Sequence, residues 1–312
     1  EEEVDLVYIF GLERNKAKEI FPPSSNFLFF EKNSSLISNF VSACHLLKSN
    51  KANVIFFISL CPQPGENPFL SQKDFLLDRA REFGITKPLM DEIFLKSYFK
   101  YEYFYSKELF KEEFQPVIAN REKKEIFLKD HFFYQGTTRE NLNLAEMKSS
   151  LPWEIFSDFH FSPGASGGCA MVLVNEEVAK EKNLKNLCEI GFYNFLTSKR
   201  NPFPLNLLEA FSQCRDFSYR AALVSTPCLK FEAFTRSFFS NGAIQKEYLG
   251  TTISLEEINP YGGDLFSGWI EGASFLRRIG FLKNYILSKK GRGILIEIIP
   301  SGPEFFMEMV VE

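Results

Sequence analysis

The sequence lacks the features that mark several classes of protein. Its six cysteines form no CxxC pair, and only three histidines occur among 312 residues. This scatter argues against a disulfide framework or a zinc site, and it predicts reduced thiols and no bound metal. No apolar run approaches the roughly 18 residues that a membrane helix needs, so we expect no transmembrane segment.

An excess of positive charge is also missing. The net charge is -4, and the densest basic run, REKKE at 121–125, is interleaved with glutamates. A solvated loop is the better interpretation of that run, and we expect no nucleic-acid partner. The chain begins with three glutamates, unlike a signal or transit peptide. We therefore expect a cytoplasmic protein, or a mitochondrial matrix protein if a eukaryotic precursor has been processed.

Phenylalanine, in contrast, is abundant, with 36 copies. Filling of a large core is the interpretation that we favour. Exposed aromatic patches that bind a partner are the alternative, and counting residues does not separate the two.

The first 61 residues have the pattern of a βαβ unit. Apolar runs at 4–10 and 26–30 predict two strands, and a continuous apolar run at 54–60 predicts a strand buried on both faces. Between them, from Asn33, apolar residues follow helical spacing, and Asn33, Ser34 and Ser35 are all suitable N-caps. The helical stripe consists of Leu36, Phe40, Ala43 and Leu47. Strand, helix and strand in this order indicate an α/β fold.

The remaining chain continues this alternation after a change in composition. Residues 62–151 are charged and aromatic, and they predict an inserted, more exposed subdomain, helical at first and loop-like around 120–143. A strand at 170–174 and a helix capped by Asn175 follow. Further elements are predicted as a strand at 221–225, a glycine turn at 261–263, a helix at 274–289 and paired strands at 294–299 and 305–311.

Four segments carry motifs that occur together in one known family. They are residues 34–54, in which Ser34 and Ser35 lead through the helix to Ala52, Asn53 and Val54; GITK at 84–87 with Asp91 and Ser97; GGCAMVL at 167–173 with Glu176, Glu177, Ala179 and Lys180; and NPYGG at 259–263 with Gly268, Gly272, Ala273, Ser274 and Arg277.

In this order and spacing the segments resemble the thiolase superfamily along nearly the whole chain. KEYLG at 246–250 is most similar to the β-subunit (acetyl-CoA acyltransferase) type of fatty-acid-oxidation trifunctional complexes. The resemblance implies a layered αβαβα fold with an inserted loop subdomain. The family's first strand and helix are expected to be missing, because the chain begins where the second strand should be.

The resemblance also implies a division into domains. Residues 1–61 match the first part of the N-terminal half, and residues 62–151 match the loop subdomain. Residues 152–180 match the end of the N-terminal half, and residues 181–312 match the C-terminal half.

Thiolase chemistry needs a nucleophilic cysteine, a polarising His-Glu-Ala-Phe segment, a Gly-His-Pro histidine and a second cysteine that moves a proton. By the resemblance, these four positions hold Asn33, Ser225, Trp269 and Pro300. An amide, an indole and a proline ring supply neither thiolate nor general acid. The glycines are retained while the functional groups are replaced, and the resemblance therefore implies a scaffold without the chemistry.

Other residues are weaker candidates. Cys228 is a fallback nucleophile, although a small buried apolar residue is the favoured interpretation. Cys44 is expected in the core, with His45 pointing away. Asp264 and Glu271 flank Trp269 as candidate acids, with solvated loop residues as the favoured reading.

Two further positions bear on ligand binding. His160 lies near a family asparagine and is interpreted as a satisfied structural group. The family's Ser-His pair, which usually faces coenzyme A, reads Ser97-Tyr98, and we therefore expect weak coenzyme A binding or none.

Three hypotheses of function follow. The favoured one is a non-catalytic structural or regulatory subunit in acyl-CoA and fatty-acid metabolism. Such a subunit would be a homodimer, or a hetero-oligomer with a thiolase-like or fatty-acid-oxidation subunit. The alternatives are an acetyl-CoA acyltransferase with unconventional catalytic residues, and a binder that holds acyl-CoA without turnover. No cofactor is expected, and a coenzyme A thioester is the candidate ligand.

Overall fold

The computed structural model describes a defined part of the 312-residue chain. The described ranges are 4–11, 27–30, 35–61, 85–109, 111, 114–120, 125–127, 131–148, 157–185, 187–196, 219–224, 236, 241–249, 252–270, 272–297 and 304–311. The chain forms two compact units. The first comprises Glu1–Gly65, Gly164–Glu189 and Ile270–Ile279, and the second comprises Glu66–Pro163, Ile190–Trp269 and Gly280–Glu312.

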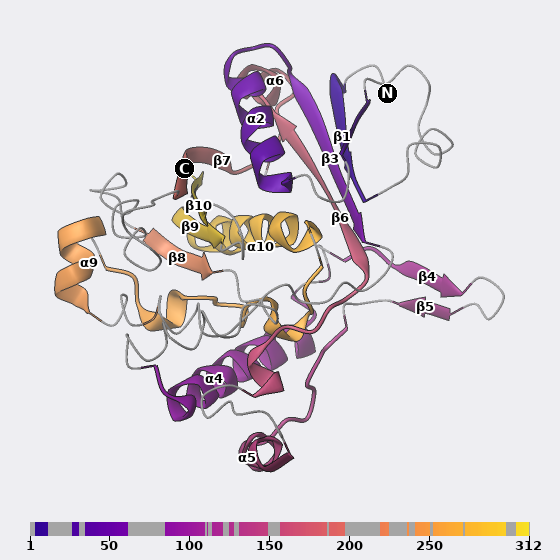
Figure 1. Ribbon diagram of the computed structural model, residues 1–312. Coiled ribbons are helices and arrows are strands. Elements are labelled where there is room, and N and C mark those ends of the chain that lie inside the picture. The colour runs from indigo at the N-terminus through magenta and orange to yellow at the C-terminus, as the bar shows by residue number, and fades with distance from the viewer. Residues whose placement is uncertain are drawn as a thin grey trace. The chain divides into compact units, whose positions relative to one another are not determined.

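The first unit is built on a four-stranded sheet (Figure 1). Its strands are β1 (Leu6–Phe10), β2 (Phe27–Phe30), β3 (Val54–Cys61) and β6 (Gly167–Val174), in the order β2-β1-β3-β6. β1 pairs in parallel with both β2 and β3, whereas β6 is antiparallel to β3. The predicted βαβ unit is confirmed, because the helix α2 connects β2 to the parallel strand β3.

The helix α2 (Leu36–Lys48) presents the predicted apolar stripe to the sheet. Phe40 packs against Phe57 of β3 at a ring-centroid distance of 5.8 Å. The N-cap is Ser35, whose hydroxyl accepts a hydrogen bond from the Ser38 N–H at 3.3 Å. Ser35 was one of the three predicted caps, and its carbonyl is the first in the helix to accept a hydrogen bond, from the Asn39 N–H. The interpretation of Asn33 itself as the N-cap is wrong.

The two faces of this sheet are covered to different degrees. On one face, Val7, Ile9 and Ile58 form a small buried apolar cluster, while Val172 is 56% exposed. The prediction that β3 is buried on both faces is thus wrong for this face, where Phe56 and other outward residues are only partly buried.

The helix α6 (Glu176–Glu181) begins where the sequence predicted. Asn175 is its N-cap, and the Asn175 side-chain oxygen accepts from the Val178 N–H at 2.9 Å. Glu176 and Glu177 lie in the first turn, where the helix dipole favours negative charge.

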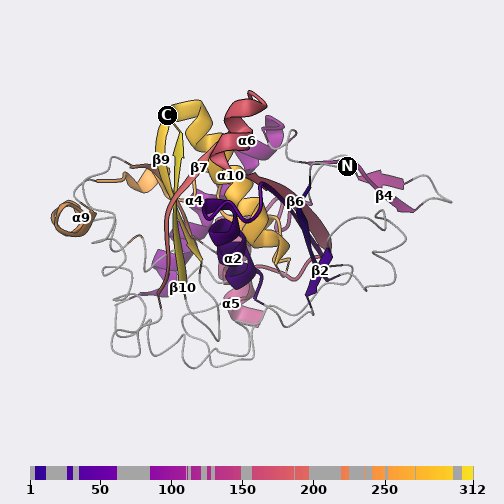
Figure 2. The ribbon, with the colours of Figure 1, turned by 90° about the horizontal axis from the view of Figure 1, so that it is seen from above.

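The second unit contains a second four-stranded sheet. Its strands are β7 (Glu189–Leu196), β8 (Tyr219–Val224), β9 (Gly291–Glu297) and β10 (Glu304–Val311), in the order β7-β10-β9-β8. β9 and β10 are antiparallel and run side by side in Figure 2, which confirms the predicted terminal pair.

The helix α10 (Ala273–Lys289) precedes β9 and packs on it. The unit boundary falls within this helix, after Ile279. A Cβ placed on Gly293 of β9 would lie 2.5 Å from a methyl group of Leu282, so only glycine admits the helix this close.

The helix α4 (Lys87–Ser106) is the core of the segment predicted to be an exposed insertion. That prediction is wrong for one face of α4, because Ile93, Phe94 and Tyr101 are buried. The remaining elements of the segment are β4 (Val117–Asn120), β5 (Glu125–Phe127) and α5 (Arg139–Lys148), so the stretch predicted as a loop contains a short hairpin and the start of a helix.

Aromatic packing around α4 supports the core-filling interpretation of the phenylalanine content. Phe266 contacts the rings of Phe94, Tyr98 and Tyr101 at centroid distances of 5.2–5.7 Å. Although α4 has 20 residues, no helix in the described part of the chain combines the length and hydropathy needed to cross a membrane.

Candidate functional site

Of the four predicted catalytic positions, Trp269 is the one that falls on described residues. It follows Gly268, which has a φ of 82°, and its backbone N–H donates to the carbonyl of Pro163 at 2.7 Å. The indole side chain is half-buried. The structure therefore places Trp269 beside the segment that ends at Pro163.

The other predicted site residues lie outside the described residues. Ser225 and Cys228 follow the end of β8, Pro300 falls between β9 and β10, and Asn33 precedes α2. Glu271 is also outside. The chemical roles assigned to these positions stay predictions.

The glycine turn before Trp269 rests directly on α4. Gly262 and Gly263 have φ angles of 87° and 76°, which side-chain-bearing residues rarely adopt. A Cβ on Gly262 would lie 2.4 Å from the carbonyl oxygen of Ser97. The predicted turn is confirmed, and glycine is required there both for its backbone angle and for its close approach to the helix.

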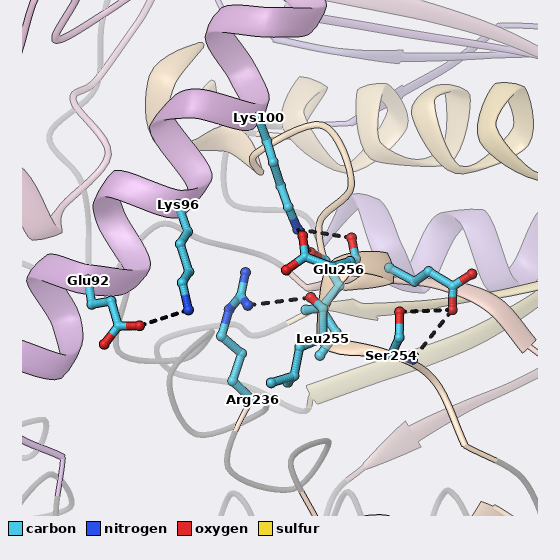
Figure 3. Close-up of polar contacts among 9 residues, drawn as sticks. Glu92, Lys96, Lys100, Arg236, Ser254, Leu255 and Glu256 are labelled. Atoms are coloured by element: carbon cyan, nitrogen blue, oxygen red, sulfur yellow. Dashed lines mark hydrogen bonds and ion pairs between the residues drawn. The ribbon is translucent and has the colours of Figure 1, made fainter.

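Polar contacts from α4 hold the chain just before this turn (Figure 3). The Lys100 ammonium donates to the carbonyls of Glu256 and Ile258 at 2.9 and 3.2 Å. Arg236 donates from Nη1 to the carbonyl of Leu255 at 3.4 Å. These donors fix the short helix η3 (Leu255–Glu257), from which the chain enters the turn.

A buried polar cluster lies at the other end of α4. The Asp91 carboxylate accepts from the Lys87 ammonium through Oδ2, and its Oδ1 lies 2.7 Å from His160 Nε2. His160 closes the short helix η2 (Asp158–His160), and its ring is fully buried. The Ser157 N–H approaches His160 Nδ1 at 3.2 Å.

The charge state of the cluster follows from these contacts. Burial raises the pKa of Asp91, but hydrogen bonds and charge from His160 and Lys87 outweigh it, so the pKa lies below its ordinary value. Asp91 is thus ionised at neutral pH. His160 Nδ1 faces the backbone N–H of Ser157, and Nε2 faces the Asp91 carboxylate.

The segment from Ser157 to Pro163 connects this cluster to Trp269. The Tyr134 hydroxyl donates to the carbonyl of Phe161 at 2.9 Å, and the Ser162 hydroxyl donates to the carbonyl of Asp264 at 3.2 Å. One segment therefore binds α4 through His160, the 131–138 region through Phe161, and the Trp269 loop through Ser162 and Pro163.

Three further expectations can be compared with the structure. Cys44 is buried, which raises the pKa of its thiol to about 12, and its expected place in the core is confirmed. His45 is exposed, as expected. The reading of Asp264 as a solvated loop residue is wrong, because it is buried within the short helix η4 (Asp264–Phe266), whose carbonyls bind Ser162 and Ser267.

Tyr98 belongs to the pair that the resemblance matched to the family's Ser-His pair, and that match stays a prediction. Its hydroxyl accepts from the Gly136 N–H at 2.9 Å and donates to Glu102 at 3.1 Å. Burial raises the pKa of Tyr98, so the hydroxyl stays neutral. The bond to Gly136 joins α4 to the 131–138 region, and the bond to Glu102 lies within α4. In the described residues no three His, Cys, Asp or Glu side chains gather as a metal site would need.

Comparison with solved structures decides the family of folds. The chain superposes on human mitochondrial 3-ketoacyl-CoA thiolase with a TM-score of 0.78, at 14% identity, covering 100% of this chain and 88% of that one. A thiolase from Ascaris suum in complex with coenzyme A gives 0.75 at 17% identity, with coverage of 99% and 88%. The chain has a thiolase fold. The dimeric peroxisomal thiolase of Saccharomyces cerevisiae agrees, with a TM-score of 0.74, 17% identity and coverage of 99% and 85%.

Sequence comparison gives a weaker likeness to the same group. An acetyl-CoA acetyltransferase from Candida albicans is 26% identical over 220 residues, which are 68% of this chain and 52% of that protein. The chain thus spans about half the length of this curated relative. No family model matches the sequence. The resemblance to thiolases inferred from the four motifs is nevertheless confirmed by the fold and by this relative.

The thiolase-like chain also contains a site that the motifs did not predict. Lys87 and Asp91 were noticed as parts of one motif, and His160 was noticed alone. Lys87 and Asp91 are four residues apart on a helix, and this spacing predicts that they pair. No sequence pattern predicts that Asp91 contacts a histidine 69 positions away.

Proposed function

We propose that this chain is a non-catalytic thiolase-like protein, a structural or regulatory subunit linked to acyl-CoA and fatty-acid metabolism. The proposal rests on Trp269, which the resemblance assigns to the position of the Gly-His-Pro histidine. An indole N–H has no basic lone pair and does not titrate near neutral pH, so it cannot act as general acid or base. The Trp269 backbone N–H is engaged by the carbonyl of Pro163.

The retained turn supports the same reading. Gly262 is needed for its approach to the Ser97 carbonyl, and Gly268 for its positive φ, whether or not chemistry takes place. The motif glycines therefore have a structural cause in this chain. Their presence is consistent with a fold that is retained without catalytic activity.

Coenzyme A is a candidate ligand because a fold neighbour was solved in complex with it. In this chain, Tyr98 stands where the family has a histidine, and its hydroxyl is bound to Gly136 and Glu102. A ligand could use this hydroxyl only by displacing one of these bonds. We expect weak coenzyme A binding or none.

Association with another subunit is the proposed mode of action. One fold neighbour is described as dimeric. By that likeness, we propose a homodimer, or a hetero-oligomer with a thiolase-like or fatty-acid-oxidation subunit. The likeness of residues 246–250 to the β-subunit type of trifunctional complexes favours the second arrangement. A strictly monomeric protein at micromolar concentration, together with no binding to such a subunit, would contradict this part.

The alternative is an acetyl-CoA acyltransferase that uses Cys228 in place of Asn33. The two are separated by incubating the protein with acetoacetyl-CoA and free coenzyme A, then measuring acetyl-CoA and the intact protein mass. Under the proposal, turnover stays at background and no acyl group is trapped on the chain. Turnover that disappears in Cys228→Ala but persists in Cys188→Ala would establish the alternative.

A third reading, an acyl-CoA binder without turnover, is tested by calorimetry with the same thioester. Saturable binding without product would favour it. Tyr98→Phe provides a matched variant, since it keeps the ring and removes only the hydroxyl that Gly136 and Glu102 share.

A further inference from the structure

The Lys100 ammonium lies among oxygen atoms at the C-terminal end of the short helix η3. It donates to the carbonyls of Glu256 and Ile258 at 2.9 and 3.2 Å, and the Glu256 carboxylate lies 3.6 Å away (Figure 3). Carbonyls at a helix C-terminus have no partner within the helix and carry partial negative charge. We call these two carbonyls and the carboxylate the oxygen cradle. Its geometry and its charge both favour a cation.

The chain on either side of the oxygen cradle is attached to the fold independently of Lys100. Before the cradle, Gln245 donates from Nε2 to the carbonyl of Ile253 at 3.3 Å and accepts from the Ile253 N–H through Oε1 at 2.6 Å. After the cradle, the Asn259 N–H donates to the carbonyl of Ala222 in β8 at 2.9 Å. The carbonyls of the cradle should therefore keep their places when the Lys100 side chain is removed.

The charges around the oxygen cradle favour a monovalent ion. Arg236 donates to the carbonyl of Leu255, the residue before Glu256, so a second positive charge already lies close to the cradle. Calcium takes a larger set of oxygen ligands that includes carboxylates. Backbone carbonyls, in contrast, replace the hydration shell of potassium, and they accept hydrogen bonds from an ammonium group.

We propose that the oxygen cradle is a monovalent-cation site in which the Lys100 ammonium is a covalently attached cation, and that the site takes a potassium or primary ammonium ion when this side chain is removed. The Lys100 side chain is 16% exposed and the Glu256 side chain 80% exposed, so an ion can enter from the Glu256 side. The site goes beyond the proposed function and does not depend on it. An inactive chain, a binder or an enzyme would contain it equally.

Two variants of Lys100 test the site by thermal unfolding. Lys100→Ala leaves a space that propylammonium matches, whereas Lys100→Met fills that space without a charge. We expect both to lower the melting temperature by roughly 3–6 °C, because hydrogen bonds from a charged group are lost. Potassium or propylammonium chloride should restore most of the loss in Lys100→Ala, because an ion that binds the folded state stabilises it. Neither salt should restore Lys100→Met.

A matched lysine and a bulky cation provide the controls. Lys96→Ala removes an exposed lysine of the same helix, which pairs with Glu92 at 2.7 Å, and it should change the melting temperature little in any of the salts. Tetramethylammonium chloride at equal ionic strength has no N–H donor and should restore nothing. A response of Lys100→Ala to propylammonium alone would support a site that requires N–H donors. No response, or equal restoration by tetramethylammonium, would overturn the site.

The parent protein offers a second test, which decides the matter if Lys100→Ala does not fold. Acetylation by a limiting amount of an N-hydroxysuccinimide ester, followed by mass spectrometry of the peptides, compares the reactivity of Lys96 and Lys100. We expect Lys96, with a side chain 55% exposed, to react several-fold faster than Lys100, whose ammonium is bound by the oxygen cradle. Equal reactivity of the two lysines would overturn the site.

Discussion

The sheet of the first unit and the surroundings of α4 are both buried, but different forces hold them. Phe57 in β3 stacks on Tyr8 at 4.7 Å and meets Phe40 of α2, with no charged partner in these contacts. At α4, a buried carboxylate is shared by an ammonium and an imidazole. Apolar contacts tolerate changes in protonation, whereas the polar cluster depends on them. The stabilisation from the apolar contacts of the sheet should therefore hardly change with pH, whereas that from the polar cluster at α4 should depend on pH.

Asp91→Ala is the variant expected to have the largest effect. It removes the carboxylate that Lys87 and His160 both contact, and breaking a buried ion pair costs about 3–5 kcal/mol. Denaturant unfolding at pH 7 measures it. Glu92→Ala, which removes the adjacent exposed carboxylate and its pair with Lys96, is the control and should change stability little. Equal losses in the two variants would contradict the structural role of the cluster.

The contribution of Asp91 should also depend on pH. Its pKa is lowered in the folded protein, so its stabilising effect is present above its ordinary value of about 4 and is lost as the pH falls below that value. The stability difference between the parent and Asp91→Asn should shrink between about pH 4 and pH 2. A constant difference over that range would show that the carboxylate contributes no more when ionised than when neutral.

Phe57→Ala tests the apolar side of the comparison. The side chain is fully buried, and its truncation should cost about 3–5 kcal/mol. The loss should be the same at pH 5 and pH 8, because burial raises the pKa of Tyr8, the titratable ring stacked on Phe57, above its ordinary value of about 10 and keeps that ring neutral over this range. Val172→Ala, on the exposed part of the same sheet, is the control with a small effect. If the loss of stability in Phe57→Ala depended on pH, the proposed difference between the apolar region and the polar cluster would be wrong.

Gly262→Ala addresses the turn that joins the polar region to Trp269. Strain from a positive φ costs about 1–3 kcal/mol, and the contact with the Ser97 carbonyl adds to it. Thermal unfolding measures the loss. Gly136 also has a positive φ, but a Cβ there meets no atom within 4 Å, so Gly136→Ala should be milder.

The smallest effect is expected at Cys44. Burial raises the pKa of its thiol to about 12, so the reactive thiolate is scarce at pH 8. Iodoacetamide should leave Cys44 unmodified in the native protein while the half-exposed Cys169 reacts. Mass spectrometry of the peptides measures both. Equal labelling of the two would place Cys44 outside the core.

The same contrast explains how much of the molecule could be predicted from its sequence. The strands and helix of the first unit follow local periodicity, and β1, α2 and β3 lie within a few residues of their predicted bounds. The cap of α2 shifted from Asn33 to Ser35, because three consecutive cap-forming residues leave the choice to the backbone. No local sequence pattern predicts the pairing of Asp91 with His160, because it depends on how α4 and η2 pack together in the fold.

The candidate site was predicted through the family resemblance more than through spacing. Trp269 lies in a loop led by a glycine of positive φ, and its assignment to the family's histidine position stays a prediction. The burial of Asp264 was not foreseen, since charge in a glycine-rich stretch usually indicates solvent. Its carbonyl serves two hydroxyl groups inside the fold, and that arrangement requires three dimensions to be recognised.

The close approach of Gly262 to the Ser97 carbonyl of α4 has a wider consequence. The fold requires glycine at this position whether or not the protein turns over a substrate. A sequence search based on such glycines would therefore find catalytically active and inactive relatives alike. Under the proposed function, the residue beside such a glycine, here Trp269, is what would distinguish an inactive chain from a catalyst.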